Sequence, residues 1–264
     1  MTTLNPKNVV GKSSFYNGDC RKILPRLDIP DSAGYLIDPD WNNYDMVKSL
    51  KLPTRFIAFC DAQYQRDVYK LFGAPLWIFT WDCITSWYVN NRPLRRVKFA
   101  FWYGNDYSEY DFNGSHFGNS GKSKTVTNPR STYQFNPDPR GKHLSDLFRY
   151  PITKRGDVVN YEKPLDWIRM LIANCLGDCS VIVDPFAGSG VGARACIQLD
   201  IASISIELDS ERYKNIVSLA QSVPKMLANN RLHPDVGDSP AQQSLFTPEA
   251  GSAEGKSPKP APRR

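Results

Sequence analysis

The sequence predicts an α/β protein whose core is a mostly parallel β-sheet covered by helices on both faces. Along most of the chain, short apolar runs of strand length alternate with stretches of helical periodicity, a pattern typical of βαβ units. A glycine-rich turn at residues 184–190 joins one apolar run to a helix-like run. The hydrophobic content of 41% suits a globular core. At 264 residues the chain is one large domain, or one domain with an inserted lobe.

Five apolar runs in the first part of the chain predict strands, at residues 15–20, 33–38, 55–60, 76–81 and 97–103. A helix-like stretch follows the first run and ends at Leu27, and a second helix is expected over residues 62–72. Asp61 is a suitable N-cap for that second helix. The last run alternates apolar and polar residues, which favours a strand on the edge of the sheet.

Residues 104–147 have a different composition. Gly, Ser, Asn, Asp, Lys and Tyr dominate without periodicity, so we expect a loop-rich insertion. Regular structure resumes at Pro164, which suits the first position of a helix. The predicted elements that follow are helices at 165–175, 191–199 and 211–222 and strands at 181–183 and 201–206. From Val223 the chain is rich in Pro, Ser, Ala, Gln and Lys, and we expect disorder.

Composition excludes several classes of protein. No run of eighteen apolar residues exists, so we expect no membrane span, and the polar segment 1–12 lacks the apolar core of a signal peptide. Most of the six cysteines lie in apolar runs, where a free thiol behaves as a small hydrophobe. Only three histidines are present to assist Cys175 and Cys179 in binding a metal. We therefore expect a reduced, metal-free protein of the cytoplasm.

The net charge of +6 is concentrated in one region of the chain. Residues 92–163 contain 13 Lys/Arg against 7 Asp/Glu, an excess equal to the whole net charge. Thirteen aromatic residues are interleaved with these charges between positions 99 and 161. Cations mixed with aromatic rings bind phosphates and stack on bases. The pattern favours a nucleic-acid surface over an ordinary solvated face.

The turn at 184–190 has the features of a cofactor-binding loop. Glycine allows the backbone to approach a ligand closely, and the helix that follows offers free N–H groups. Glu207 ends the next apolar run, seventeen residues after Gly190, where an acid accepts hydrogen bonds from ribose hydroxyls. These residues predict a pocket for a nucleoside cofactor, although a glycine turn followed by an acid also occurs in dinucleotide-binding proteins.

The string Asp-Pro-Phe-Ala-Gly-Ser-Gly at 184–190, with Lys163-Pro164-Leu165 before it, resembles the cofactor half of the S-adenosylmethionine-dependent DNA amino-methyltransferases. The resemblance covers roughly residues 14–103 and 145–220. It implies a Rossmann-like methyltransferase fold in which the catalytic half precedes the cofactor half, an order similar to the permuted beta arrangement of the family.

The same resemblance divides the chain into four parts. The assignments are a catalytic half at 13–103, a target-recognition insertion at 104–147, a cofactor half at 148–222 and a disordered tail at 223–264. Because the insertion is assigned to target recognition, the basic and aromatic region identified above falls where DNA is expected to bind.

S-adenosyl-L-methionine is the cofactor that the resemblance implies. Asp19 then lies near the adenine or ribose of the cofactor, and Lys163 lies near its methionine end. The other residues assigned to cofactor binding are Asp184, Phe186, Ala187, Gly188, Ser189, Gly190 and Glu207. Asp184 has a second interpretation, in which it braces the glycine turn without touching the ligand.

The sequence Asp38-Pro39-Asp40-Trp41, at the end of the second predicted strand, resembles the catalytic motif of this family. The family transfers a methyl group to the exocyclic amine of a flipped base, and two acceptors directed at that amine stabilise its developing positive charge. The resemblance assigns the acceptors to the Asp38 carboxylate and the Pro39 carbonyl, and Trp41 to stacking on the base. Taken alone, the same residues also suit an ordinary strand-ending turn.

Asp40 departs from the family, which usually has a second proline there. We expect the change to loosen the loop and to add a negative charge beside the base, which leaves the enzyme active, weakened or inactive. A leading acid is commoner among adenine N6 methyltransferases, and this favours adenine over cytosine N4. The remaining alternatives are a protein-glutamine methyltransferase, which usually carries Asn in place of Asp38, and an inactive DNA-binding relative.

Double-stranded DNA is the expected partner. The candidate base-contacting residues of the insertion are Arg130, Gln134, Asn136, Arg140 and Lys142. In the tail, the segment Gln242 to Phe246 (Gln-Gln-Ser-Leu-Phe) resembles the peptide that docks on bacterial sliding clamps, with chance occurrence in a polar tail as the alternative. The family resemblance further implies a protein of bacteria or of their phages, either in a restriction–modification system or as a regulator.

Overall fold

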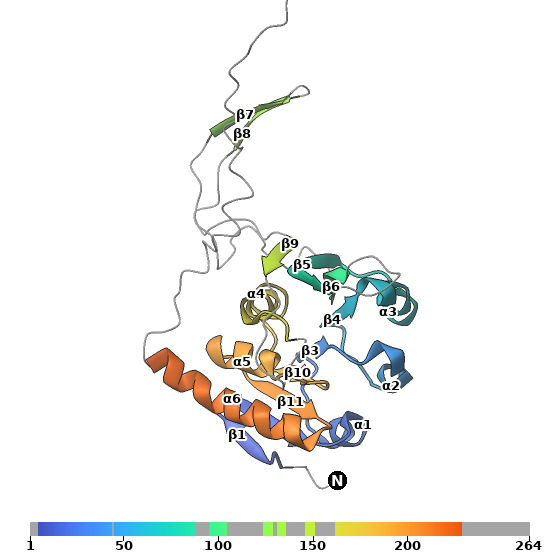
Figure 1. The fold of residues 1–264 in the computed structure, drawn as a ribbon, viewed down its shortest axis with the longest axis vertical. Helices are drawn as coiled ribbons and strands as arrows, with labels where there is room; N and C mark the ends of the chain where they lie inside the picture. Colours follow the sequence, from blue (N-terminus) through green and yellow to red (C-terminus); the bar gives the residue numbers. More distant parts are fainter. Residues whose placement is uncertain are drawn as a thin grey trace, which may run out of the picture.

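The computed structural model describes residues 5–43, 45–87, 95–104, 124–128, 131–135, 146–150 and 162–228. Within them, a nine-stranded sheet has the order β1-β2-β11-β10-β3-β4-β6-β5-β9 (Figure 1). Its strands are β1 (Asn8–Val10), β2 (Ser13–Asn17), β3 (Gly34–Ile37), β4 (Phe56–Asp61), β5 (Trp77–Trp87), β6 (Arg95–Tyr103), β9 (Leu147–Tyr150), β10 (Ile182–Asp184) and β11 (Ser203–Glu207). A separate hairpin consists of β7 (Lys124–Asn128) and β8 (Ser131–Phe135).

The described helices are α1 (Cys20–Ile23), α2 (Asp45–Lys48), α3 (Gln65–Phe72), α4 (Leu165–Cys175), α5 (Val191–Gln198) and α6 (Ser210–Ala228). Short 3-10 turns occur at η1 (Leu24–Arg26), η2 (Trp41–Asn43) and η3 (Ala62–Tyr64). None of the helices in the described part of the chain is long and apolar enough to cross a membrane.

Five neighbouring strands at the centre of the sheet are parallel. β2, β11, β10, β3 and β4 pair in that order. All four residues of β3 are buried, as expected for a strand that is covered on both faces and therefore has a continuous apolar run. β6 breaks the parallel arrangement, because it pairs antiparallel with both β4 and β5. The five parallel strands consequently end on the same edge of the sheet.

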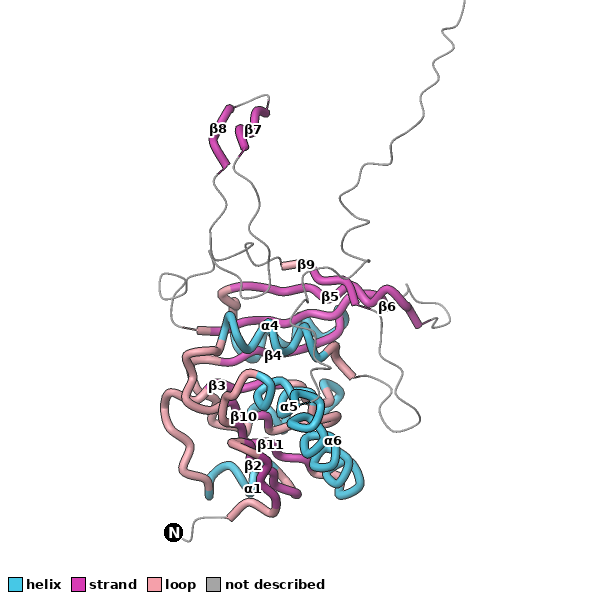
Figure 2. The backbone as a smooth tube through the Cα atoms, turned by 90° about the vertical axis from the view of Figure 1, so that its left-hand side faces the viewer, coloured by secondary structure: helices cyan, strands magenta, loops and turns pink. Residues whose placement is uncertain are grey.

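Helices cover both faces of this sheet (Figures 1 and 2). α4, α5 and α6 lie on one face, where Trp167 of α4 belongs to the same core cluster as Leu36 of β3. α1, α2 and α3 lie on the other face, where Val68 of α3 shares a cluster with Ile37 of β3. Successive side chains of a strand point to opposite faces, so β3 contributes to both cores.

The prediction of an α/β fold with a mostly parallel sheet is confirmed. The placement of the strand at 97–103 on the edge of the sheet is wrong, because β6 lies between β4 and β5. Ala100, Phe101 and Trp102 are all buried. The polar residue that suggested alternation, Lys98, is accommodated because it pairs with Asp61, its cross-strand neighbour on β4, at 2.6 Å.

Two further expectations need correction. Asp61 makes no side-chain cap bond to the helix after it, because its carboxylate pairs with Lys98 instead. The last helix does not end at Ser222, since α6 extends to Ala228. Val223 is buried and continues the apolar stripe of α6, so the expected tail starts later than residue 223.

Gly190, just before α5, offers a direct test of how closely the glycine turn packs against α6. Its φ is +72°, and a Cβ at this position would lie 2.6 Å from Cγ2 of Ile216 on α6. Gly11 has φ +58° with open space around it. We expect Gly11→Ala to lower the free energy of unfolding by about 1–2 kcal/mol through backbone strain alone. Gly190→Ala should lower the free energy of unfolding by about 1–3 kcal/mol more than Gly11→Ala does, because the added methyl group overpacks the contact with Ile216.

Urea unfolding of both variants measures the difference. Equal losses in the two variants would show that Ile216 moves aside at no cost, and that the close packing of α6 on the turn is not a restraint.

Candidate active site

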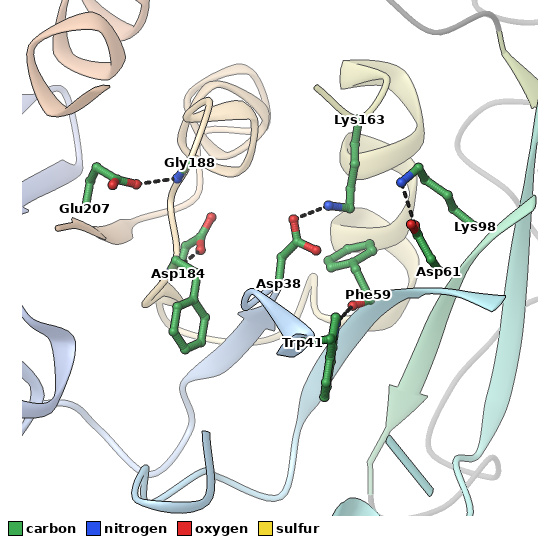
Figure 3. A network of polar contacts seen from close by, with 10 residues as sticks. Asp38, Trp41, Phe59, Asp61, Lys98, Lys163, Asp184, Gly188 and Glu207 are labelled. Atoms are coloured by element: carbon green, nitrogen blue, oxygen red, sulfur yellow. Dashed lines mark hydrogen bonds and ion pairs between the residues drawn. The ribbon is translucent and has the colours of Figure 1, made fainter. Parts of the chain in front are cut away.

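Acids at the ends of the parallel strands surround a cavity of about 570 Å³. Asp19 follows β2, Glu207 ends β11, Asp184 ends β10 and Asp38 follows β3. Parallel strands place their carboxyl ends together, so residues far apart in the sequence meet at one edge of the sheet. Figure 3 shows Glu207, Asp184 and Asp38 in a row along this edge.

The structure brings most of the predicted cofactor residues to this cavity. Those that line it are Asp19, Lys163, Asp184, Phe186, Ala187, Gly188, Ser189 and Glu207. Gly190 does not line it. The positive φ and the close approach of Ile216 give Gly190 a structural reason to be glycine instead.

Hydrogen bonds from the backbone fix the glycine turn. The Phe186 N–H donates to Oδ1 of Asp184 at 3.1 Å, so Asp184 braces the turn, as its second interpretation proposes. The Gly188 N–H donates to Oε2 of Glu207 at 2.8 Å. The other oxygen of Glu207 accepts from the Asp209 N–H at 2.9 Å. Each carboxylate oxygen retains a further lone pair, so Glu207 is fixed in place and still able to accept from hydroxyl groups.

Asp19 is held in a local interaction. Its Oδ1 accepts from the Arg21 backbone N–H at 2.9 Å, and Nη2 of Arg21 lies 2.6 Å from Oδ2. The hydrogen bond from the Arg21 side chain is the main reason that the pKa of Asp19 is lowered. Asp19 therefore remains ionised at the start of α1, at the rim of the cavity.

The carboxyl group of Asp184 has a strongly shifted pKa. Burial raises its pKa from 3.8 to about 7. The hydrogen bond from Phe186 and the ammonium of Lys163 oppose the rise, whereas the carboxylates of Asp38 and Glu207 add to it. A buried acid that is only partly ionised at neutral pH limits the negative charge in the cavity.

The Asp38 carboxylate points toward Lys163. Nζ of Lys163 forms an ion pair with Oδ2 of Asp38 (Figure 3). The Lys163 side chain is 12% exposed, whereas that of Asp38 is 42% exposed. Nζ also lies 5.0 Å from the centroid of the Phe59 ring, at a distance typical of a cation–π contact. Lys163 therefore contacts the predicted catalytic acid, in addition to lining the cofactor cavity.

Pro39 and Trp41 line a second cavity, of about 350 Å³, which shares Asp38, Asp40 and Lys163 with the first. Trp41 is only 5% exposed, and its indole Nε1–H donates to the Phe59 carbonyl at 2.7 Å. This bond attaches the turn after β3 to β4 (Figure 3). Trp41 is thus part of the core as well as part of the cavity wall.

Asp40 tightens its loop, contrary to our expectation that it loosens it. Its Oδ1 accepts from the Asn42 backbone N–H at 3.0 Å and from Nδ2 of Asn42 at 2.9 Å. Oδ1 of Asn42 in turn accepts from the Tyr64 hydroxyl at 2.7 Å. Asp40 therefore acts as a cap for η2, a role for which a short carboxylate is well suited.

The second cavity contains residues that the sequence analysis did not assign to a site. They are Asn42, Cys60, Asp61, Gln63, Tyr64, Lys98 and Phe99. Asp61 ends β4, its cross-strand neighbour Lys98 lies within β6, and both line this cavity together with the predicted catalytic turn. The position of Asp61 after an apolar run is the signal that could have placed it beside Asp38, because β3 and β4 are parallel neighbours.

The predicted DNA-contacting residues are mostly not described. Arg130, Asn136, Arg140 and Lys142 lie outside the described residues, as does the segment Gln242 to Phe246. Gln134 lies in β8, opposite Thr125 of β7. In the described ranges, no group of three or more His, Cys, Asp or Glu residues is arranged to hold a metal ion. All six cysteines are buried free thiols.

Together, the fold and this edge of the sheet have the arrangement of a Rossmann-like methyltransferase, with the glycine turn after one strand and the predicted catalytic turn, Asp38 to Trp41, after its neighbour. A family model described as DNA methylase matches residues 47–218. The match spans more than half of the chain, and the chain belongs to this family. The matched range contains Lys163, the glycine turn and Glu207, and it starts after Trp41. The chain is therefore a DNA amino-methyltransferase of the type that modifies adenine N6 or cytosine N4.

Three solved structures that match this fold are distant from the chain in sequence. M1.HpyAVI is 17% identical, with 78% of this chain and 97% of that chain covered and a TM-score of 0.52. A complex of M1.HpyAVI with SAM is 16% identical, with 78% and 98% covered and a TM-score of 0.50. The cytosine-N4-specific PvuII DNA methyltransferase is 14% identical, with 86% and 94% covered and a TM-score of 0.52. A search of the curated proteins finds no match.

S-adenosyl-L-methionine is the methyl donor of this family, and the cavity suits it. Five acids and three bases line the cavity, namely Asp19, Asp38, Asp40, Asp184 and Glu207 against Arg21, Lys163 and Arg212. An excess of acids favours a ligand that carries a sulfonium and an ammonium. The exposed Leu208 beside Glu207 adds an apolar surface of the kind that a purine ring covers.

The raised pKa of Asp184 predicts how stability depends on pH. The folded state binds the proton of Asp184 more tightly than the unfolded state. The contribution of Asp184 to the free energy of unfolding is therefore greatest below about pH 4 and is lost as the pH rises through about 7. Asp184→Asn removes this titration and keeps an acceptor for Phe186. The free energy of unfolding of the variant, relative to the wild type, should therefore increase between about pH 4 and about pH 7 and level off at higher pH. A difference that is constant across this range would contradict the assignment.

The capping role of Asp40 predicts different results for two substitutions. Asp40→Asn keeps an oxygen acceptor for the Asn42 N–H and should leave the free energy of unfolding nearly unchanged. Asp40→Ala removes the acceptor and should lower it by about 0.5–2 kcal/mol. Chemical denaturation of the two variants at one pH compares them. If Asn is as destabilising as Ala, then the charge of Asp40 matters and the cap does not.

Proposed function

We propose that this protein transfers a methyl group from S-adenosyl-L-methionine to the N6 amine of an adenine flipped out of a specific double-stranded DNA sequence. The observation that carries the proposal is the position of Asp38, which borders the cavity of the glycine turn and also the cavity of the catalytic turn. A carboxylate shared by two adjoining cavities can contact a base in one while the methyl donor occupies the other.

The residues around the larger cavity would hold the cofactor. Glu207 would accept from the ribose hydroxyls, because its carboxylate is already oriented by Gly188 and Asp209. Asp19 would lie at the adenine or ribose edge, and the turn from Asp184 to Ser189 would contact the remainder. When bound, the cofactor supplies an electrophilic methyl group on a sulfonium, and no metal is needed for the transfer.

Asp38 and Pro39 would activate the target amine. The lone pair of an exocyclic amine is delocalised into the ring, so the nitrogen is a poor nucleophile. A carboxylate oxygen of Asp38 and the Pro39 carbonyl, each accepting one N–H, would draw the nitrogen toward a tetrahedral geometry and stabilise its developing positive charge. Proline has no N–H and a fixed φ, which helps to aim its carbonyl.

The smaller cavity is where the flipped base would enter. Trp41 lines it, and a base could stack there on the part of the indole that faces the cavity. The hydrogen bond from Trp41 to Phe59 would keep the ring in place during stacking. Residues of the insertion, with Arg130, Gln134, Asn136, Arg140 and Lys142 as candidates, would select the DNA sequence.

Adenine is favoured because an aspartate leads the catalytic motif, and cytosine N4 is the second candidate. Asp40 gives a weaker case for an inactive DNA-binding relative than the sequence suggests, because its carboxylate is bound to Asn42. Docking of the segment Gln242 to Phe246 on a sliding clamp is a separate hypothesis, and a binding measurement with the purified clamp tests it.

A methyl-transfer assay tests the proposal. The purified chain is incubated with cofactor labelled in the methyl group and with unmethylated bacterial genomic DNA, and the modified nucleosides are separated. We expect label in N6-methyladenine. Asp38→Ala should reduce the rate about 10²–10³-fold while the cofactor affinity, measured by calorimetry, stays within about threefold.

Each other outcome has a defined meaning. Label in N4-methylcytosine would replace the adenine assignment and keep the reaction class. DNA binding without any label would favour the inactive relative. Loss of cofactor affinity in Asp38→Ala, with the fold intact, would show that Asp38 holds the cofactor and is not the amine acceptor.

A further inference from the structure

Lys163 has a position that its assignment to the cofactor does not explain. It lines both cavities, and its ammonium contacts the carboxylate of Asp38 and the face of Phe59. Figure 3 shows the Lys163 side chain extending from the start of α4 toward Asp38. A residue that only held the methionine end of the cofactor would have no reason to face the catalytic turn.

The ion pair leaves part of the Asp38 carboxylate available. The contact uses Oδ2, and Oδ1 makes no hydrogen bond with the part of the chain that the structure describes. A carboxylate held at one oxygen loses its freedom to rotate about χ2. Its second oxygen is therefore presented in a defined direction before a substrate arrives, which is the condition for preorganised catalysis.

A buried ion pair anchors the segment that carries Lys163. Glu162, its neighbour, accepts from Nη2 of Arg194 on α5 at 2.5 Å, and the two side chains are 4% and 5% exposed. Breaking such a buried pair is strongly destabilising, because it leaves an uncompensated buried charge. The anchor fixes the backbone at position 162 to the helix that follows the glycine turn, so the reach of Lys163 toward Asp38 is set by the cofactor half of the fold.

The surrounding charges also favour a cation at this point. Asp38, Asp184 and Glu207 line the same cavity, and Asp38 and Glu207 both act on the buried carboxyl of Asp184. The Lys163 ammonium offsets the repulsion among these carboxylates. Without it, Asp38 would be expected to turn outward to solvent, since its side chain is already 42% exposed.

We propose that Lys163 is a positioning residue for methyl transfer, which fixes the Asp38 carboxylate through Oδ2 and so directs Oδ1 at the target amine. The inference rests on the proposed function of Asp38 as an amine acceptor. Lys163 does not touch the reacting atoms in this scheme and acts through Asp38. It differs from the family assignment, in which the lysine belongs to the cofactor.

The test compares three variants in the methyl-transfer assay. Lys163→Met, which keeps the length of the side chain and removes its charge, should lower kcat about 10- to 100-fold, while the cofactor affinity measured by calorimetry stays within about threefold. Lys163→Arg should restore most of the rate, because a guanidinium also binds a carboxylate. Lys214→Met is the matched control, since it removes one charge from an exposed pair on α6 and should leave kcat unchanged.

A double-mutant cycle separates positioning from a general structural effect. If Lys163 acts through Asp38, the variant with both Lys163→Met and Asp38→Ala should be no slower than Asp38→Ala alone. Rate losses that multiply would overturn the proposal. If the cofactor affinity falls as much as kcat does, then Lys163 binds the cofactor and is not a positioning residue. A faster Lys163→Met would show that the lysine masks Asp38 and does not position it.

The cycle also has a readout that does not need activity. The melting temperatures of the two single variants and the double variant should be non-additive, because the ion pair is lost only once. Additive shifts would mean that the two side chains do not interact in solution, and the proposal would fail. A wild-type chain that transfers no label to any DNA overturns the proposed function instead, and the thermal cycle still reports whether the pair exists.

Discussion

The site depends on one arrangement, the parallel pairing of β10 with β11 on one side and with β3 on the other. β10 is only three residues long, yet it joins the half of the chain that carries the glycine turn to the half that carries Asp38 and the proposed catalytic turn. Because the three strands run in the same direction, Glu207, Asp184 and Asp38 are set side by side at one edge. A one-residue register shift of β10 would move the Asp184 side chain to the other face of the sheet.

The electrostatics of the site follow from that arrangement. Acids gathered at one edge repel each other, and the structure limits the repulsion in two ways. Burial raises the pKa of Asp184 to about 7, so part of its charge is removed near neutral pH. Glu207 and Asp38 remain in contact with hydrogen-bond donors, the backbone N–H groups of Gly188 and Asp209 in one case and Lys163 in the other. The remaining negative charge suits a cationic ligand.

Much of this is predictable from the sequence, because the strands are short apolar runs that end in acids or glycines. The parallel core, the glycine turn and the shared cavity of Asp38 and Glu207 follow from that pattern and from the family resemblance. The interior place of β6 does not, since a lysine in a strand suggests solvent until its partner Asp61 is known. The capping by Asp40 and the contact between Lys163 and Asp38 also depend on tertiary geometry, which a linear pattern does not contain.

The direction of the outer strands has a consequence for changing which DNA the enzyme accepts. β5 and β9 run parallel to each other, and both run parallel to β4. The chain therefore leaves β5 at Trp87 and β9 at Tyr150 on the edge that holds both cavities, whereas β6 ends at Tyr103 on the opposite edge. If the smaller cavity receives the base, as we propose, redesign of target preference should vary the residues at the ends of β5 and β9 in addition to the proposed recognition stretch 104–147.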